Sequence, residues 1–437
     1  MKRKLSIVLL IAMVLSLALP CVAFAEEPVK ITVLTRYIDG AGDAMNQFYY
    51  DRMHQFDEEN EDIIIEDISV NELDVYNQKL KSSIASNEFP DVFLNYGYSN
   101  ISEWVKNGLL RDLSEIVNAE DYTGPAGDAF LSPWDYSLSG IEGVYGIPSN
   151  VNVGMVFYIN KKLLDSYGLK VPETWEDVYE IAPTLIENGI TPIALSAGTK
   201  GRLAHFHTAL SMKMFGLDVR EKLLTGEIKW SEGESMEVLN KYEEMINMGL
   251  FGSDAISMDA NGMQAAFLNG EAAMYPGMLV NSTQTLAAAE AEGDFVMKNF
   301  FYFRDKPEYK NYWFLPAGDG LSIMTPENEP ERFEAAKRFV NYMICADSFA
   351  LQAQQNGPSV FPVVLDFAEL GVETNPTMSA FFDEYSAVES ASDEFDVYFD
   401  FSSSQEIFRT EIQTLFAGVD AASVAASLDA QYAAKLK

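Results

Sequence analysis

The sequence predicts an α/β protein of two domains, each a β-sheet flanked by helices. Short apolar, β-rich runs alternate with segments whose apolar residues recur at helical spacing, and this alternation is typical of α/β domains. The 437 residues are 48% hydrophobic and exceed what one core accommodates, so we expect two cores. No internal repeat or low-complexity tract interrupts the alternation.

The first part of the chain predicts a β-α-β-α-β unit. Strands are expected at 29–37, 62–70 and 90–97, and helices at 44–60 and 75–86. Sheets of this kind bind ligands beyond the carboxyl ends of their strands, so the loops after these strands are candidate ligand-binding segments.

The middle of the chain continues the pattern. A helix is expected within 171–190, because Thr174 is a good N-cap and Glu176 and Asp177 lie in the first turn. Further elements are expected at 191–198 (strand), 236–251 (helix) and 282–292 (helix capped by Asn281 or Ser282).

The stretch "LNGEAAMYPGMLVN" (268–281) predicts a glycine turn and a short strand. The strand is expected from Glu271 to Tyr275 and is expected to break at Pro276, because proline removes a backbone donor. Gly277 would then let the backbone pass close to a ligand. The corner from Tyr275 to Met278 carries no reactive group, so we interpret it as part of a binding wall.

The N-terminus predicts an export signal over residues 1–25. Three cations at 2–4 precede an almost unbroken apolar run, and "AFA" at 23–25 has the small-x-small pattern of a cleavage site. The run is shorter than the roughly 20 residues that span a bilayer. We therefore expect an exported protein that is extracellular, associated with the cell surface, or periplasmic.

Cys21 leaves a second fate open for this leader, because lipoproteins are anchored through a cysteine after a short apolar run. Pro20 directly before it fits that pattern poorly, so we expect Cys21 to be removed with the leader. Cys345 is then the single cysteine that remains, which excludes an internal disulfide. Its place in an apolar helical pattern predicts that it lies in the core.

The charge excludes several classes of partner. The formal net charge is −36, and loss of the three cations in the leader makes it −39. Such a field repels nucleic acid and anionic membrane surfaces, and it also disfavours a strongly anionic ligand. The acidic residues are scattered along the chain, so we interpret most of them as solvated surface.

The sequence shows no catalytic or metal-binding motif. There is no G-x-S-x-G elbow, Walker loop or G-x-G-x-x-G, and we expect neither a cofactor nor a metal site around His54, His205 and His207. "DEFDVYFD" (393–400) lacks the glycine and acid spacing of an EF-hand, so it is interpreted as a solvated acidic stretch. A glycosidase needs only two carboxylates, and with 66 acidic residues this alternative stays open.

Seven ordered blocks give the chain a resemblance to a known family. They are "KITVLT" (30–35), "FPDVFL" (89–94), "YGIPSNVNVGMVFYINKKLLDSYGLKVPETWEDV" (145–178), "AAFLNGEAAMYPG" (265–277), "GDGLSIM" (318–324), "RFEAAKRFVNYM" (332–343) and "GVDAASVAASLDAQY" (418–432). With these blocks the chain resembles the extracellular solute-binding proteins of ABC transporters, in the sugar- and oligosaccharide-binding branch (family 1, maltose-binding-protein-like). The third block, with Y-G-I-P, Y-x-N-K and P-x-T-W-x-D, is the most specific.

The resemblance implies a two-lobed, type II periplasmic-binding-protein-like fold with hinge crossings and a ligand cleft. It assigns residues 28–150 and 305–350 to lobe 1, and residues 151–304 and 351–437 to lobe 2. It also implies a non-enzymatic protein, expected to be a monomer, that captures a neutral mono- or oligosaccharide by lobe closure and delivers it to ABC permease subunits. Two alternatives remain open, namely a secreted glycoside hydrolase and a two-lobed sensor for a receptor kinase.

Candidate ligand-binding residues are those whose rings stack on sugar faces or whose polar groups pair with hydroxyls, where strands end in loops. They are Arg36, Tyr37, Asn95 and Tyr96 in lobe 1, Asn150 and Asn152 at the crossing, His205, Tyr275, Gly277 and Met278 in lobe 2, and Trp313 and Asp319 near the return crossing. Met278 stands where the family that the chain resembles commonly has a stacking tryptophan. Either Met278 packs on a sugar ring with its flexible thioether, or stacking passes to Tyr275, Tyr96 or Trp313. Trp175 and Trp230 are expected to be packing residues.

Overall fold

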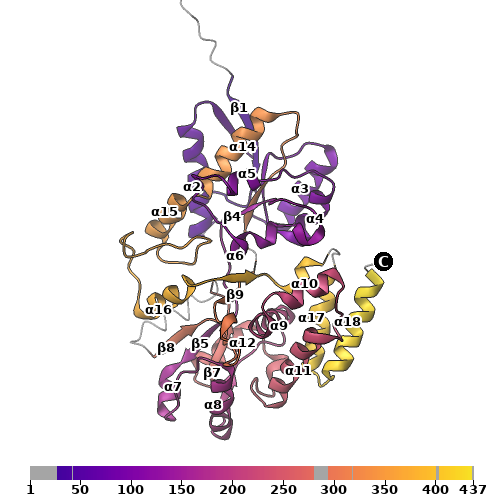
Figure 1. Cartoon of the computed structure of the whole chain (residues 1–437). Helices are drawn as coiled ribbons and strands as arrows, with labels where there is room; N and C mark the ends of the chain where they lie inside the picture. The colour runs from indigo at the N-terminus through magenta and orange to yellow at the C-terminus, as the bar shows by residue number, and fades with distance from the viewer. Residues whose placement is uncertain (1–26, 42, 280–293, 317, 400–402, 436–437) are drawn as a thin grey trace, which may run out of the picture.

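The computed structural model describes residues 27–41, 43–279, 294–316, 318–399 and 403–435. It shows two α/β lobes, one above the other in Figure 1, connected by several crossings of the chain. The predicted export signal with Cys21 and the predicted helix at 282–292 lie outside the described residues. Among the described helices, none is both long and apolar enough to cross a membrane.

Lobe 1 contains a five-stranded sheet in the order β2-β1-β3-β10-β4. Its strands are β1 (Val29–Leu34), β2 (Ile63–Asp67), β3 (Val92–Asn95), β4 (Ile147–Pro148) and β10 (Gly320–Ile323). The first three are parallel, which confirms the predicted unit, whereas β10 is antiparallel to β3 and to β4. Because Gly320 pairs with Asn95, the chain returns to lobe 1 at the carboxyl end of β3.

Most helices of lobe 1 cover this sheet. The helices of this lobe are α2 (Ala44–Glu59), α3 (Leu73–Ser86), α4 (Tyr98–Lys106), α5 (Ser114–Val117), α6 (Asp128–Leu131), α14 (Pro330–Met343) and α15 (Ala346–Asn356). The predicted helical spacing of α2 is confirmed, because Phe48, Tyr49, Met53 and Phe56 are buried. Cys345 is only partly buried at the N-cap of α15, so the prediction that it belongs to the core is wrong.

Lobe 2 contains a four-stranded sheet in the order β6-β7-β5-β8. Its strands are β5 (Val156–Asn160), β6 (Thr191–Ile193), β7 (Ala272–Gly277) and β8 (Phe295–Lys298). Strands β6 and β7 are parallel, and β5 is antiparallel to both β7 and β8. A separate two-stranded sheet joins β9 (Tyr312–Phe314) to β11 (Ser390–Ser392).

The helices of lobe 2 pack around its sheet and, at one side, form a helical layer (Figure 1). They are α7 (Lys161–Ser166), α8 (Trp175–Glu187), α9 (Lys200–Phe215), α10 (Asp218–Thr225), α11 (Gly233–Asn247), α12 (Ala260–Leu268), α16 (Pro376–Tyr385), α17 (Ser404–Phe416) and α18 (Ala421–Lys435). The predicted start of α8 is confirmed as a capping box, in which Thr174 and Asp177 exchange side-chain to backbone hydrogen bonds of 2.9 and 3.2 Å. Trp175 and Trp230 are buried in the core of this lobe, as predicted.

The predicted break of the 271–275 strand is wrong, because β7 continues through Pro276 and Gly277. The carbonyl of Met274 accepts a hydrogen bond from Ala194 on the β6 side, and alternate residues of a strand point their backbone groups to the same side. The nitrogen of Pro276 therefore faces the side on which β6 has already ended. No donor is needed there, so proline does not interrupt pairing with β5.

The two lobes have separate hydrophobic cores. Leu321 and Ile323 belong to the lobe 1 core with Phe93, whereas Trp313 and Leu315 pack in a cluster of lobe 2 with Tyr158. We propose on this basis that the return crossing lies near residue 318 rather than at 305, and that lobe 1 extends to about residue 372.

Candidate functional site

A cavity of about 240 Å³ lies where the lobes meet, beyond the carboxyl end of β3. Residues of lobe 1 and lobe 2 both line it, with Pro316 of the return crossing between them. Lobe 1 contributes Tyr96 and Gly97 from the β3–α4 loop and Tyr98 and Asn100 from the first turn of α4. Lobe 2 contributes Asp393, Glu394 and Val397 from the segment before α17 and Gln405 from α17 itself. This is the edge of the sheet at which α/β folds bind ligands, so we take the cavity as the candidate site.

On the side of lobe 1, Tyr96 lines the cavity and belongs to a connected polar network. Arg36 donates from Nη1 to the hydroxyl of Tyr96 at 2.8 Å and from Nε to the carbonyl of Asn71 at 2.8 Å. The Tyr96 hydroxyl and the Asp319 carboxyl also interact, since each influences the pKa of the other. Desolvation raises the pKa of the Asp319 carboxyl to about 6, although the charge of Arg36 and the amide of Asn150 oppose this rise.

The chain crossings beside this network are tied together by Asn150 and Asp319. The Asn150 amide nitrogen donates to Asp319 Oδ2 at 3.1 Å, and the backbone N–H of Asp319 donates to Asn150 Oδ1 at 2.9 Å. A Cβ at Gly318 would overlap the Asn150 side chain, so only glycine fits at that position. The two crossings therefore hold the network at a fixed position between the lobes.

The wall from lobe 2 is centred on Glu394. Its carboxylate accepts hydrogen bonds from Arg409, at 2.7 to 3.1 Å, and contacts His205 Nε2 at 2.6 Å. Burial alone would raise the pKa of Glu394, but His205 and Arg409 lower it to about 2. Burial raises the pKa of the neighbouring Asp396, and the charge of Glu394 raises it further.

The interpretation of 393–400 as a solvated stretch is therefore wrong, because residues 393–399 are buried. Phe395 and Phe399 pack in the core of lobe 2, whereas Val397 and Tyr398 pack in the core of lobe 1. This segment bridges the two lobes next to the cavity. Its Glu394 carboxylate is stabilised by His205 and Arg409, which come from other elements.

Four of the predicted candidates meet in the lobe 1 network, and a fifth contacts the lobe 2 wall. Arg36, Tyr96, Asn150 and Asp319 are linked as described, and His205 holds Glu394. His205 and His207 lie on helix α9 and not on a strand; His207 is buried against Phe408, and burial lowers its pKa to about 3. Among the residues that the structure describes, no group of three metal-ligating side chains occurs.

Four other candidates are buried, and their side chains contact other residues of the protein. Tyr37 bonds Ser149 at 2.8 Å, and Asn95 bonds Ser322 and Trp134 at 2.7 and 2.8 Å. Trp313 is 1% exposed between the rings of Phe381 and Tyr385. Tyr275 is 3% exposed and stacks on Tyr158, with ring centroids 4.7 Å apart.

The remaining candidates are Gly277, Met278 and Asn152. A Cβ at Gly277 would lie 2.9 Å from the rings of Tyr158 and Tyr275, so the glycine is required by ring packing. Met278 is partly buried beside Gly154, whose added Cβ would lie 2.9 Å from the methionine sulfur, and Asn152 is also partly buried. Ligand contact by any of the twelve candidates stays a prediction.

Sequence reasoning missed Asp393, Glu394, Arg202 and Arg409. A signal was available in the alternation of "FDVYF" (395–399), where large apolar residues interrupt the acids and indicate burial. The cations that neutralise the carboxylates come from distant parts of the chain, so no local pattern indicates them.

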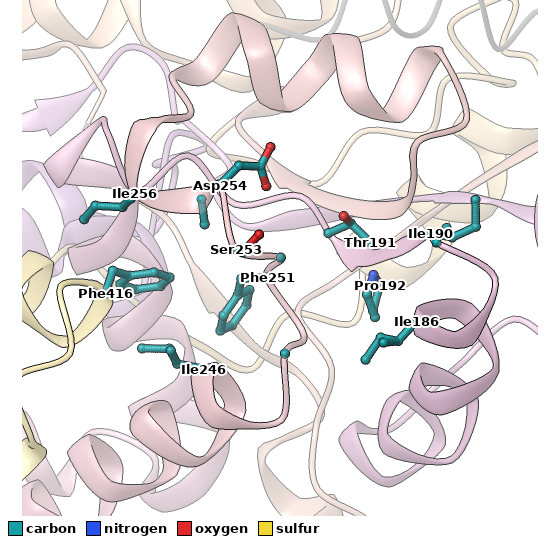
Figure 2. A pocket seen from close by; sticks show the side chains of 14 residues that line it. Ile186, Ile190, Thr191, Pro192, Ile246, Phe251, Ser253, Asp254, Ile256 and Phe416 are labelled. Atoms are coloured by element: carbon teal, nitrogen blue, oxygen red, sulfur yellow. The ribbon is translucent and has the colours of Figure 1, made fainter.

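A larger cavity, of about 540 Å³, lies elsewhere in lobe 2 (Figure 2). It lies between the ends of α8 and α11, and its lining is mainly apolar, including Ile186, Ile246, Phe251 and Phe416. Thr191 at its rim is the first residue of β6, so this cavity extends to the amino end of the strand. None of the twelve candidates lines it, and we do not assign the ligand to it.

Comparison with known proteins gives a consistent result. A family model described as "Bacterial extracellular solute-binding protein" matches residues 38–347. The "Multiple sugar-binding protein" of Streptococcus mutans is 25% identical over 276 residues, which cover 61% of each chain, so the match spans about three fifths of that relative. The "Putative ABC transporter periplasmic-binding protein YcjN" of Escherichia coli is 26% identical over 325 residues, 71% of this chain and 68% of the relative.

A solved structure of a family 1 extracellular solute-binding protein from Bifidobacterium longum subsp. infantis is similar in fold. Its TM-score is 0.75 at 18% identity, and the match covers 93% of this chain and 100% of the other. This similarity confirms the predicted two-lobed α/β fold with helix-flanked sheets.

Proposed function

Because this chain belongs to the family of bacterial extracellular solute-binding proteins, we propose that it is the binding component of an ABC importer for a neutral carbohydrate. It captures a mono- or oligosaccharide between its lobes and delivers it to permease subunits in the membrane. The matched family and the relatives are binding proteins and not enzymes, so the hydrolase alternative is not supported. The sensor alternative is not supported either.

The observation that carries the choice of ligand is the pairing of charges around the interlobe cavity. Arg36 lies in one network with Asp319, and Arg409 is paired with Glu394. An uncharged ligand leaves both pairs balanced, whereas an ionic ligand would compete with one of them. Sugar hydroxyls both donate and accept, so they can bond carboxylate, amide and guanidinium groups alike.

The apolar part of the cavity is compatible with a sugar ring. The half-buried ring of Tyr96, together with Pro316 and Val397, provides apolar surface for the less polar face of a pyranose. The name of the Streptococcus mutans relative supports the same ligand class.

The expected location is outside the cytoplasm, as in the extracellular and periplasmic relatives. We propose that residues 1–25 are removed on export, that Cys21 leaves with them, and that the protein acts as a monomer. Mass spectrometry of the native N-terminus decides the fate of Cys21. An N-terminus at Glu26 supports removal, and a diacylglyceryl cysteine contradicts it.

Calorimetric titration with a panel of neutral mono- and oligosaccharides tests the ligand class. We expect at least one of them to bind with a Kd well below about 1 mM, which corresponds to roughly −4 kcal/mol. The matched controls are uronic acids and amino sugars of the same ring configuration. Binding of a solute from another class, with none of the neutral sugars bound, would contradict the proposal.

A further inference from the structure

Arg202 is a buried cation whose hydrogen bonds are incomplete. The residue is 9% exposed, and its Nη1 atom has no hydrogen-bond partner among the described residues. Burial lowers its pKa, although the charge of Glu394 opposes this effect. Arg409 differs from it, because Arg409 makes a bidentate contact with Glu394. A buried guanidinium donor without an acceptor costs free energy, so an acceptor from outside the described chain would stabilise it.

The position of Arg202 in the fold points to the ligand cleft. It lies in the first turn of α9, which follows β6 through the loop 194–199. Strands β6 and β7 are parallel, so this turn is at their carboxyl ends, the edge at which such sheets bind ligands. Its charge interacts with Glu394, which lines the interlobe cavity, and with Tyr275 near the carboxyl end of β7.

We propose that Arg202 is a ligand-binding residue of lobe 2, whose Nη1 donates a hydrogen bond to an oxygen of the bound saccharide. This inference rests on the proposed function, because it concerns the same cleft. Nη1 is covered in the present structure, so the proposal requires that parting of the lobes uncovers it for the ligand.

The surroundings of Arg202 also define the acceptor. Glu394, which is held by His205 and Arg409, is close enough for its charge to act on Arg202 as well. A second carboxylate from the ligand would be placed close to Glu394 and repelled by it. The acceptor is therefore an uncharged oxygen, such as a hydroxyl, a ring oxygen or a glycosidic oxygen.

The test compares Arg202→Met and Arg202→Lys with a matched variant of a second arginine. Arg111 is the control, because its Nη1 is also buried without a described partner. Its backbone N–H bonds Ile323, at the end of β10 away from the cleft, and its guanidinium stacks on Phe333 at 3.8 Å. We expect Arg202→Met to weaken binding of the best neutral sugar roughly ten- to hundredfold, and Arg111→Met to leave Kd unchanged.

The affinity for deoxy sugars distinguishes a ligand contact of Arg202 from a purely structural role. In the wild-type protein, one monodeoxy analogue should lose affinity because it lacks the oxygen that Arg202 binds. In Arg202→Met, that analogue and the parent sugar should bind with equal Kd. Circular dichroism and thermal unfolding establish that each variant is folded.

The outcomes separate the two proposals. If the wild-type protein binds no neutral sugar, the proposed function fails. If it binds one, and folded Arg202 variants keep Kd within twofold, the role of Arg202 is refuted while the function stands. If the variants do not fold, the arginines of the wild-type protein are labelled with butanedione instead, and the labelled sites are mapped by mass spectrometry. Sugar should protect Arg202 but not Arg111, and equal labelling with and without sugar would overturn the inference.

Discussion

Asn150 and Asp319 hydrogen bond to each other in both directions, although they are 169 positions apart in the sequence. Each lies on a different crossing between the lobes, so this pair fixes the spacing of the crossings at the cleft. The same Asp319 carboxyl interacts with Tyr96, whose hydroxyl accepts a hydrogen bond from Arg36. One side chain thus connects the hinge region to the ligand wall.

Replacement of Asp319 by asparagine should weaken sugar binding. The neutral amide removes the negative charge that acts on Arg36, and an amide nitrogen in place of Oδ2 cannot accept the hydrogen bond that Asn150 donates. We expect Kd to rise by roughly tenfold, the factor that corresponds to about 1.4 kcal/mol. Isothermal titration measures the change. Asp62→Asn, which alters an exposed ion pair with Arg338, is the control and should leave Kd unchanged.

The Asp319 carboxyl should also give the protein a defined dependence of stability on pH. Its pKa is raised from 3.8 to about 6 in the folded state, so the folded state binds this proton more tightly than the unfolded state. The contribution to stability is therefore fully present below pH 3.8 and is lost as the pH rises through 6. It amounts to at most about 3 kcal/mol.

Urea unfolding of the wild-type protein and of Asp319→Asn across pH 4 to 7 isolates this contribution. We expect the wild-type protein to lose free energy of unfolding relative to the variant as the pH rises over this window. A difference that is constant with pH would show that Asp319 titrates near its ordinary value.

Tyr275→Ala should reduce stability much more than affinity. The ring is stacked on Tyr158 and packs edge-on to Phe267, and it is almost fully covered. Its truncation should cost about 3–5 kcal/mol of unfolding free energy, with little change in Kd. Gly277→Val should be similarly destabilising, because its side chain would clash with the rings of Tyr158 and Tyr275. Tyr275→Phe keeps the stack and serves as the control; a large loss of affinity in folded Tyr275→Ala would instead identify a ligand contact.

Tyr398→Ala should make the unliganded protein more open. Tyr398 is on the segment that bridges the lobes, where it packs on Tyr98 of lobe 1 with ring centroids 4.8 Å apart, and Arg220 lies 4.8 Å from its ring. Loss of this ring removes a contact that exists only while the lobes are together. Small-angle scattering should show a larger radius of gyration for the variant without sugar, and Tyr398→Phe should behave as wild type. Equal radii for all three proteins would contradict this prediction.

Local signals were sufficient for much of the fold. The spacing of Phe48, Tyr49, Met53 and Phe56 placed α2, and the Thr174 capping box placed the start of α8, because both depend on neighbouring residues. The resemblance supplied the arrangement of the lobes, which periodicity cannot give. Pro276 misled the prediction, since whether a strand tolerates proline depends on where the adjacent strand ends.

The candidate site was only partly predictable for a related reason. Arg36 and Tyr96 follow strands of one sheet, and Asp319 precedes another strand of it. They were predictable because ligands bind beyond the carboxyl ends of the parallel strands in such sheets. Glu394 is different, because the environment that makes it a buried anion comes from His205, 189 positions away, as well as from Arg409. The acidic composition of this segment therefore led to the wrong prediction that it is exposed to solvent.

The place of β10 in the lobe 1 sheet has a consequence for biosynthesis. This strand separates β3 from β4, and the contact of Asn95 with Ser322 joins residues 227 positions apart. A chain that has emerged only to residue 300 holds every strand of the main lobe 2 sheet, but it cannot close the lobe 1 sheet. Such distant pairing is slow to form. The nascent polypeptide should thus remain incompletely folded until late in its synthesis, which is compatible with the export that we propose.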